Sequence, residues 1–440
     1  MVAGSTVSTL SERLARLRAA GKAPEGRAHP GGEGDPSEAA AREGAAAESS
    51  SRESRVELPR RRNRPAHRAG VRSDSAAGGF RDSVPPGSGW TQTGDFLWER
   101  LLAYPPVLPD EFPNPFVLPE SSSTCDLVFY DLETTGLSGG AGNTAFLIGL
   151  GFQKDGIFSV IQLFLADYPG ESAMLERYAA LIGDDLPQVS YNGRSFDSQV
   201  LRTRFLLNRM PPPSPPQVDL LYPARRLWGG ILPNAALGTL EREVLGFFRE
   251  DDLPGSEAPE AWFSWLEGDG GRIEGVFRHN ADDIVSLARL LAKIEEWGRT
   301  DPMDFAASAD GRGMKLPDGA DVSPLGMARQ WAFRDEGLER RWLGAGWELR
   351  AERCGRELAL RRRREGNLSG AREIWEALNA EGSHYEAAVE LAKQWEHARK
   401  NPGKALEIVS RLEDLPLSDH RRRELEHRLS RLRRKAEGSS

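Results

Sequence analysis

"YDLETTGL", residues 130–137, is the most informative stretch of this chain. It continues the apolar run CDLVF, which predicts a buried strand. Asp131 and Glu133 are two residues apart, and a strand directs side chains at that spacing to one face. Two carboxylates so close raise each other's pKa and destabilise the fold unless a cation or a proton neutralises them. The stretch therefore predicts either a solvated strand end before a turn or one part of a divalent metal site.

Composition and cysteine content indicate a globular protein of a reducing compartment. The 440 residues are 39% hydrophobic and 28% charged, and no apolar run approaches the roughly 20 residues that cross a bilayer. The two cysteines, Cys125 and Cys354, argue against a disulfide framework and a cysteine-type zinc site. We therefore expect a cytoplasmic protein without a membrane partner. The formal net charge of −8 does not indicate a nucleic-acid binder, although an acidic tail can mask a basic groove.

Changes in composition divide the chain into successive parts. Residues 1–88 are rich in Ala, Gly, Ser, Glu and Arg and poor in large apolar residues, which predicts a disordered tail. Prolines and aromatic residues in 89–123 predict an extended segment that packs on the following core. The core domain is expected at 124–298, a Gly- and Asp-bearing connector at 299–345, and an α-helical region at 346–436.

The core domain has the pattern of an α/β fold. The runs AFLIGLGFQ and IFSVIQLFLAD flank Asp155-Gly156, a strong signal for a β-hairpin. A helical pattern in ESAMLERYAALIG, a short strand in LPQVSYNG and a second helix in SFDSQVLRTRFLLN follow. The last helix, DDIVSLARLLAKIEEW, has an apolar stripe that includes Ile284, Leu287 and Leu291. This order predicts a mixed β-sheet flanked by helices.

The C-terminal region carries a weak internal repeat. Four residues recur 34 positions later: Asn367, Ala371, Ile374 and Leu378 match Asn401, Ala405, Ile408 and Leu412. A period of 34 residues is typical of tetratricopeptide repeats, which have two helices per unit. The match is loose and covers about two units, so a plain pair of helical hairpins is the alternative. Such helices more often bind a protein partner or pack on their own domain, whereas the arginine runs in this region make phosphate contact an alternative.

Two more carboxylates complete a candidate metal site, and a histidine precedes one of them. Asp197 follows the Asn192-Gly193 turn at the start of a predicted helix, and Asp283 is placed at the start of the last helix, four residues after His279. Each aspartate alone could be a helix cap. Together with the two carboxylates on the strand, they predict four carboxylates at one sheet edge, which requires cations. Oxygen ligands of this kind suit Mg²⁺ or Mn²⁺.

Asp283 rather than its neighbour Asp282 is the predicted ligand. Asp283 is four residues before Leu287 and lies at the edge of the apolar stripe, where an inward carboxylate needs a partner. Asp282 aligns with Ser286 and Arg289 on the wetter side of the helix, and we interpret it as a cap.

The order of these motifs resembles that of the DEDD 3′–5′ exonucleases of the ribonuclease H-like fold, and closely that of the bacterial YprB-type family. The resemblance rests on YDLETTGL, GNTAFLIGLG, YNGRSFDSQVLRTRFL, VDLLYPARRLW, LGTLEREVLG, DLPGSEAPEAWFSWLEGD and VFRHNADDIVSLARLL, which span about 126–295. It implies a metal-dependent 3′–5′ exonuclease that acts on a single-stranded end of DNA or RNA. It also implies two metal ions, Mg²⁺ or Mn²⁺, held by Asp131, Glu133, Asp197 and Asp283.

The position of His279 departs from that family. DEDD exonucleases usually place a His five residues, or a Tyr four residues, before the last Asp, and here a His occupies the tyrosine position. We interpret His279 as the candidate general base, because an imidazole titrates near neutral pH.

Five other residues are candidates for binding substrate, each with a structural alternative. Thr134 and Gly136 could let a terminal nucleotide approach the metals, or could form a flexible turn. Asn192 could orient Asp197 or touch the substrate, or could serve the turn alone. Arg225 and Arg226 could contact phosphate, or could lie on a solvated helix face.

Two other functions fit the same sequence. One is a ribonuclease H-like scaffold that binds nucleic acid or protein without cleaving, and the four intact carboxylates count against it. The other is an endonuclease of the same fold. Release of mononucleotides from a 3′ end would distinguish the exonuclease from both.

Overall fold

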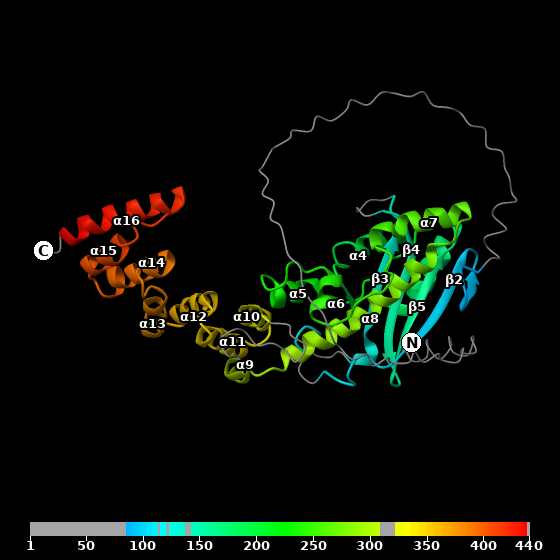
Figure 1. Cartoon of the computed structure of the whole chain (residues 1–440), viewed down its shortest axis with the longest axis horizontal. Helices are drawn as coiled ribbons and strands as arrows, with labels where there is room; N and C mark the ends of the chain where they lie inside the picture. Colours follow the sequence, from blue (N-terminus) through cyan, green and yellow to red (C-terminus); the bar gives the residue numbers. More distant parts are fainter. Residues whose placement is uncertain (1–84, 113–114, 120–122, 137–141, 309–321, 438–440) are drawn as a thin grey trace, which may run out of the picture.

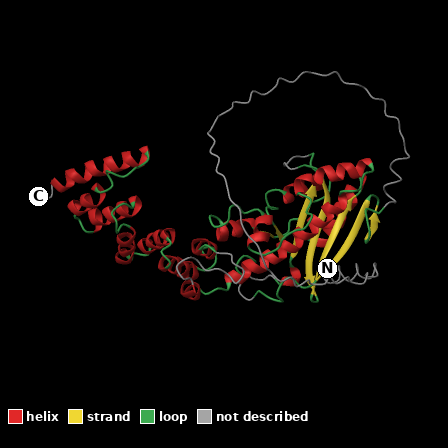
Figure 2. Ribbon diagram, in the orientation of Figure 1, coloured by secondary structure: helices red, strands yellow, loops and turns green. Residues whose placement is uncertain are grey.

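The computed structural model describes residues 85–112, 115–119, 123–136, 142–308 and 322–437. The tail predicted at 1–88 lies outside these residues, except for its last few positions. An α/β domain is followed by a line of helices that leads away from it (Figures 1 and 2). Among the described residues, no helix has both the length and the apolar composition needed to cross a membrane.

A mixed sheet of seven strands, in the order β1-β2-β5-β4-β3-β6-β7, forms the centre of the α/β domain. Its strands are β1 (Trp90–Gly94), β2 (Leu97–Tyr104), β3 (Val128–Thr134), β4 (Ala145–Lys154), β5 (Ile157–Leu165), β6 (Gln188–Ser190) and β7 (Gln217–Asp219). β3, β6 and β7 run parallel, and the other neighbours are antiparallel. The predicted α/β class with a mixed sheet is confirmed.

The predicted hairpin joins β4 to β5. Asp155 and Gly156 have φ values of 50° and 73°, which a two-residue turn of type I′ requires at both positions.

A second hairpin, β1–β2, corrects the prediction that 89–123 is an extended segment on the core. β2 pairs with β5 along its whole length. The sequence does not predict this strand because its polarity is reversed: Arg100 is buried and Leu101 is exposed. The rest of the segment agrees with the prediction, since Leu108 and Phe116 are buried in the core.

Helices cover both faces of the sheet. They are α3 (Glu171–Ile182), α4 (Asp197–Leu207), α5 (Leu221–Trp228), α6 (Leu237–Glu243), α7 (Ala258–Glu267) and α8 (Ile273–Gly298), with 3₁₀ turns at Thr124–Asp126, Tyr168–Gly170 and Gly255–Glu257. α8 crosses β3, β4 and β5 on one face, and α3 and α4 lie on the other. The apolar stripe predicted for the last helix is confirmed, since Ile284, Leu287 and Leu291 are buried.

The stretch 299–345, predicted to be a connector, is largely helical where it is described. The C-terminal helices are α9 (Pro302–Ser308), α10 (Pro324–Trp331), α11 (Glu336–Glu348), α12 (Glu352–Arg364), α13 (Leu368–Leu378), α14 (Tyr385–Lys393), α15 (Pro402–Ser410) and α16 (Asp419–Glu437), with a π-helical turn at Gln394–Ala398. α10 packs closely on α5: a Cβ at Gly326 would lie 1.9 Å from the carbonyl oxygen of Arg226. The first helices after the sheet domain therefore share its hydrophobic core.

A polar clamp ties this junction together. The Glu295 carboxylate on α8 accepts hydrogen bonds from the backbone N–H groups of 116–118, at 2.6 to 3.2 Å. Gln330 of α10 donates to the carbonyl oxygen of Phe116 at 3.3 Å, and Arg334 donates to that of Pro115 at 2.8 Å. One short segment is thus held from two sides, by α8 and by the C-terminal helices.

The 34-residue repeat corresponds to two equivalent helix starts. Asn367 caps α13 by accepting from the N–H of Gly370, and Asn401 caps α15 by accepting from the N–H of Lys404, each at 2.9 Å. The helices pack in sequence, α11 to α12, α13 to α14 and α15 to α16. Membership of the tetratricopeptide class stays a prediction.

Candidate metal centre

The strand β3 carries the first two carboxylates to the face of the sheet that α8 covers. Asp131 and Glu133 occupy alternate positions of the strand, and Glu133 is buried. The strand ends where the Thr134 hydroxyl donates to the carbonyl oxygen of Gly136 at 2.8 Å. The alternation predicted from the sequence therefore directs both carboxylates toward one helix.

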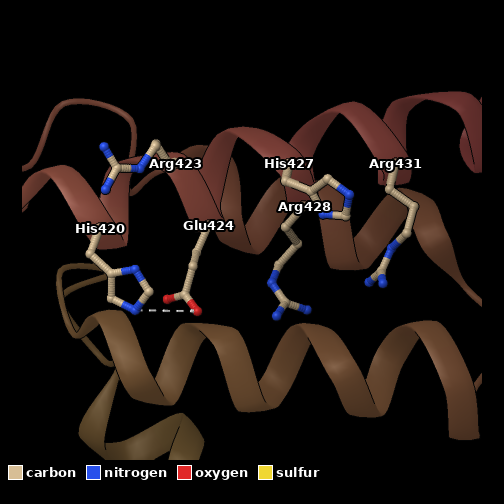
Figure 3. A pocket seen from close by; sticks show the side chains of 6 residues that line it. All are labelled: His420, Arg423, Glu424, His427, Arg428 and Arg431. Atoms are coloured by element: carbon tan, nitrogen blue, oxygen red, sulfur yellow. Dashed lines mark ion pairs between the residues drawn. The ribbon is translucent and has the colours of Figure 1, made fainter.

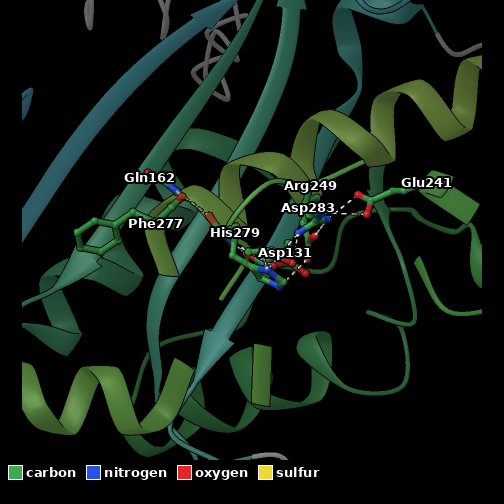
Figure 4. A network of polar contacts seen from close by, with 9 residues as sticks. Asp131, Gln162, Glu241, Arg249, Phe277, His279 and Asp283 are labelled. Atoms are coloured by element: carbon green, nitrogen blue, oxygen red, sulfur yellow. Dashed lines mark hydrogen bonds and ion pairs between the residues drawn. The ribbon is translucent and has the colours of Figure 1, made fainter. Parts of the chain in front are cut away.

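A string of buried hydrogen bonds positions Asp131. Gly149 of β4 lies opposite Asp131, and a Cβ on it would come within 2.3 Å of the Asn280 side chain on α8. Asn280 Nδ2 donates to Asp131 Oδ2 at 3.0 Å, and Asn280 Oδ1 accepts from Gln162 Nε2 at 3.0 Å. Gln162 Oε1 in turn accepts from Arg100 Nη2 at 2.8 Å. Figure 4 shows this string leading from Gln162 toward Asp131.

Asp197 is the first residue of α4, as predicted, and is buried. The turn before it is held by Asp219 at the end of β7, whose carboxylate accepts from the backbone N–H groups of Asn192 and Arg194, at 2.8 and 3.2 Å. Asn192 has a φ of 62° and accepts a hydrogen bond from the Ser195 hydroxyl at 3.0 Å. Its side chain therefore serves the turn that presents Asp197.

The position of Asp283 within α8 corrects two predictions. α8 begins at Ile273, so Asp282 and Asp283 lie well inside the helix rather than at its start. Asp282 is therefore not a helix cap. Asp283 still points to the predicted side, where Arg249 Nη2 donates to its Oδ1. The same guanidinium is paired with the buried Glu241 of α6, so one cation joins two carboxylates (Figure 4).

His279 lies one helical turn before Asp283, and its Nε2 is 3.7 Å from Asp283 Oδ2. Its Nδ1 lies 2.7 Å from Asp252 Oδ1 and 3.1 Å from Arg249 Nη1. These contacts ask opposite roles of Nδ1, because the carboxylate accepts a hydrogen bond and the guanidinium can only donate one. The tautomer with the proton on Nδ1 keeps the shorter contact as the hydrogen bond and leaves Nε2 as an acceptor.

The four carboxylates repel one another. Burial, followed by the charge of Asp283, raises the pKa of Asp131 and of Glu133 well above the ordinary values. Burial and the charge of Asp219 raise the pKa of Asp197 to about 7. Burial also raises the pKa of Asp283, although His279 and Arg249 oppose the shift. The arrangement therefore disfavours the ionised form of each group and favours a bound cation.

The donor set suits a hard divalent cation. Carboxylate oxygens are the ligands preferred by Mg²⁺ and Mn²⁺, and Asp131, Glu133, Asp197 and Asp283 supply them from β3, α4 and α8. Within the described residues, no three His, Cys, Asp or Glu side chains converge closely enough to hold a metal ion as they stand. Arg249 occupies Asp283 instead, so metal binding would require this arginine to release that carboxylate.

The predicted substrate-binding residues lie in different surroundings. Arg226 donates to Gln330 at 2.7 Å and stacks on Phe333, both in the C-terminal region, whereas Arg225 is exposed. Gly136 lines a pocket of about 610 Å³ together with residues of α7, including Phe263. The pocket adjoins the end of β3, next to Glu133 and Thr134.

Comparisons with known proteins identify the family of this chain. A family model described as the RNase_H superfamily matches residues 128–295. The Bacillus subtilis protein named "Uncharacterized protein YprB" is 32% identical over 326 residues, which cover 70% of this chain and 75% of the relative. The chain belongs to the YprB family of ribonuclease H-like proteins. The suspected family and the ribonuclease H-like fold class are thereby confirmed.

One solved structure gives a weaker similarity. The family B DNA polymerase from the hyperthermophilic archaeon Pyrobaculum calidifontis matches at 15% identity with a TM-score of 0.32. The match covers 55% of this chain and 34% of the polymerase, so the chain spans about a third of that protein's length. A likeness of this size carries no argument.

Four residues of this YprB-family site are not predicted from the sequence: Glu241, Arg249, Asp252 and Asn280. The motif around Arg249, GFFREDD, has the composition of a solvated loop, and nothing local shows that its arginine reaches α8. One feature of the sequence could have indicated Asn280, namely its position in the HNADD stretch between His279 and Asp283.

We predict that metal-free protein loses stability as the pH rises through the titration of Asp197. Because its pKa is raised to about 7, the folded state binds this proton more tightly than the unfolded chain. The stabilisation is full below the ordinary pKa of aspartate and is lost, at up to about 1.4 kcal/mol per pH unit, as the pH approaches 7. Asp197→Asn should show a shallower decline and exceed the wild type in stability at pH values above 7.

Urea unfolding in EDTA over a pH series measures this difference. Asp155→Asn, in the β4–β5 turn, is the control, because it removes one carboxylate outside the cluster. Equal pH dependence in the wild type and Asp197→Asn would contradict the assignment of repulsion to this site.

We also predict that Arg249→Gln binds Mn²⁺ at least about tenfold more tightly than the wild type, because it removes the cation that competes for Asp283. The same change leaves the Glu241 carboxylate buried and unpaired, which should cost about 3–5 kcal/mol of stability without metal. The double variant Glu241→Gln/Arg249→Gln should recover much of that loss.

Titration calorimetry with Mn²⁺ measures the affinity, and Arg278→Gln, an exposed arginine on α8, controls for net charge. If Arg249→Gln and Arg278→Gln changed the affinity equally, Arg249 would not compete for the site.

Proposed function

We propose that this protein is a metal-dependent 3′–5′ exonuclease that hydrolyses the phosphodiester bonds of nucleic acid. The observation that carries the proposal is the mutual repulsion of four carboxylates brought together by β3, α4 and α8. Such a cluster does not stabilise the fold by itself. Two divalent ions bound to it would neutralise its charge and could act in phosphodiester hydrolysis. The ribonuclease H-like family supports a nuclease in general, and the order of the four residues supports the exonuclease type.

In this proposal, some residues of the chain hold the metal ions and another accepts a proton. Asp131, Glu133, Asp197 and Asp283 would hold two Mg²⁺ or Mn²⁺ ions. When bound, such ions lower the pKa of a water and stabilise charge on the leaving oxygen. His279 Nε2 faces the same carboxylates and can accept a proton, while Asp252 holds the opposite ring nitrogen. Asn280 keeps Asp131 oriented.

The pocket beside β3 supports a nucleotide at the strand end. Its volume of about 610 Å³ falls within the range of small-molecule sites. Phe263 on α7 is 42% exposed and lines this pocket, and an exposed ring of this kind can stack on a base without selecting its identity. Gly136 lines the same pocket, while Arg225 offers a phosphate contact and Asn192 shapes the turn.

A degradation assay tests the proposal. Single-stranded DNA and RNA, labelled at the 3′ or 5′ end, are incubated with the full chain in Mg²⁺, Mn²⁺ or EDTA. We expect stepwise release of mononucleotides from the 3′ end that requires metal. Asp131→Asn and Asp283→Asn should abolish it, while Asp282→Asn, one residue along α8, should retain it.

Two outcomes would contradict the proposal. Internal cleavage of a circular or end-blocked strand would identify an endonuclease of the same fold. Binding without hydrolysis in either metal would identify a non-catalytic scaffold.

We predict that His279→Gln slows hydrolysis by about 10²–10⁴-fold, the usual contribution of a positioned general base. Mn²⁺ affinity should change little, because the imidazole nitrogen faces Asp283 at 3.7 Å rather than replacing it as a ligand. The loss should appear in kcat, with little change in the KM for the oligonucleotide, because the imidazole would act on the attacking water and not on substrate binding. An unchanged kcat would show that His279 only packs beside the site.

A further inference from the structure

The last helix, α16, has a charge opposite to that of the whole chain. The chain carries a formal net charge of −8, whereas residues 419–437 contain eight Lys and Arg against four Asp and Glu. A concentrated positive helix in an acidic protein is the usual electrostatic footprint of a polyanion site.

The carboxylates next to α16 do not cancel this charge, because two of them, Glu386 and Glu396, are each shared by two cations. Glu386 of α14 pairs with Arg356 of α12 at 2.9 Å and with Arg421 of α16 at 3.3 Å. Glu396 pairs with two more residues of α16, Arg431 at 2.6 Å and Lys435 at 2.7 Å. A positive excess therefore remains after the ion pairs are formed.

Part of this positive charge lies at a pocket. Six side chains of α16 line a space of about 330 Å³ (Figure 3): His420, Arg423, Glu424, His427, Arg428 and Arg431. Within the described residues, Arg423 and Arg428 make no ion pair, and Arg423 and His427 are exposed. The carboxylate of the group, Glu424, lies 3.9 Å from His420 Nε2. The pocket thus presents guanidinium groups with unused donors.

We propose that this face of α16 binds the phosphate backbone of a nucleic acid strand. Guanidinium groups match phosphate oxygens in geometry and charge. No aliphatic side chain and no Phe, Tyr or Trp lines the pocket, which disfavours a protein partner, since the core of a protein interface is apolar and depleted in charged residues. This inference rests on the proposed function. It adds that α16 binds a nucleic acid strand far from its 3′ end, while the 3′ end itself lies at Asp131. α16 and β3 lie at opposite ends of the line of helices (Figure 1), so only a long strand reaches both.

Binding of labelled poly(dT) and poly(U) to the full chain in EDTA tests this inference without hydrolysis. The test variant is Arg423→Gln/Arg428→Gln. The control is Arg422→Gln/Arg433→Gln, which removes the same charge from α16 at residues that bind the chain itself, Leu415 and Glu413. Circular dichroism and the unfolding midpoint establish that both variants are folded.

We expect the pocket variant to bind at least about tenfold more weakly, and the control less than about twofold. The slope of log affinity against log salt should fall in magnitude by about 1.4, because two contacts to a single strand are lost. Hydrolysis of a trinucleotide, which is too short to reach α16, should be unchanged in both variants.

Equal weakening in the two variants, or none in either, would overturn the inference. Polyglutamate that displaces the strand from the wild type and not from the pocket variant would instead identify α16 as a site for an acidic protein. Because the binding assay contains no metal, a chain that binds as expected but hydrolyses nothing would refute the proposed function and leave the α16 site standing.

Discussion

The contact between Asn280 and Gly149 is the constraint on which the rest of the site depends. A glycine on β4 lets α8 approach the sheet so closely that the Asn280 amide lies over the strand and reaches Asp131. Any side chain at Gly149 would displace α8, and Asp283 and His279 would move with it. Because Gln162 satisfies the other end of the amide, the buried contact leaves no unpaired polar group.

Repulsion among the clustered carboxylates lowers the stability of the folded state, and an ion pair within the protein offsets part of this loss. Arg249 places one positive charge on Asp283, and Glu241 fixes the arginine from behind. Without this cation, folding would have to bury several like charges at once.

Local patterns predict most of the fold and where Asp131 and Asp197 lie within it, whereas the features that they do not predict depend on contacts between distant parts of the chain. Asp131 and Asp197 were predicted because strand alternation and a helix start are local features. The start of α8 was not, since Gly275 interrupts the helical pattern before His279. Arg249 was missed because its partners are distant in sequence, and the strand at Leu97–Tyr104 because its buried arginine breaks the alternation.

The polar clamp at Glu295 connects α8 mechanically to the C-terminal helices. Asp283 and Glu295 lie about three turns apart on α8, a stiff rod. The segment 116–118 fastens the far end of that rod to the C-terminal helices through Gln330. Tension on those helices is therefore borne by the helix that carries Asp283, so a force applied to the C-terminal helices reaches the carboxylate cluster through α8.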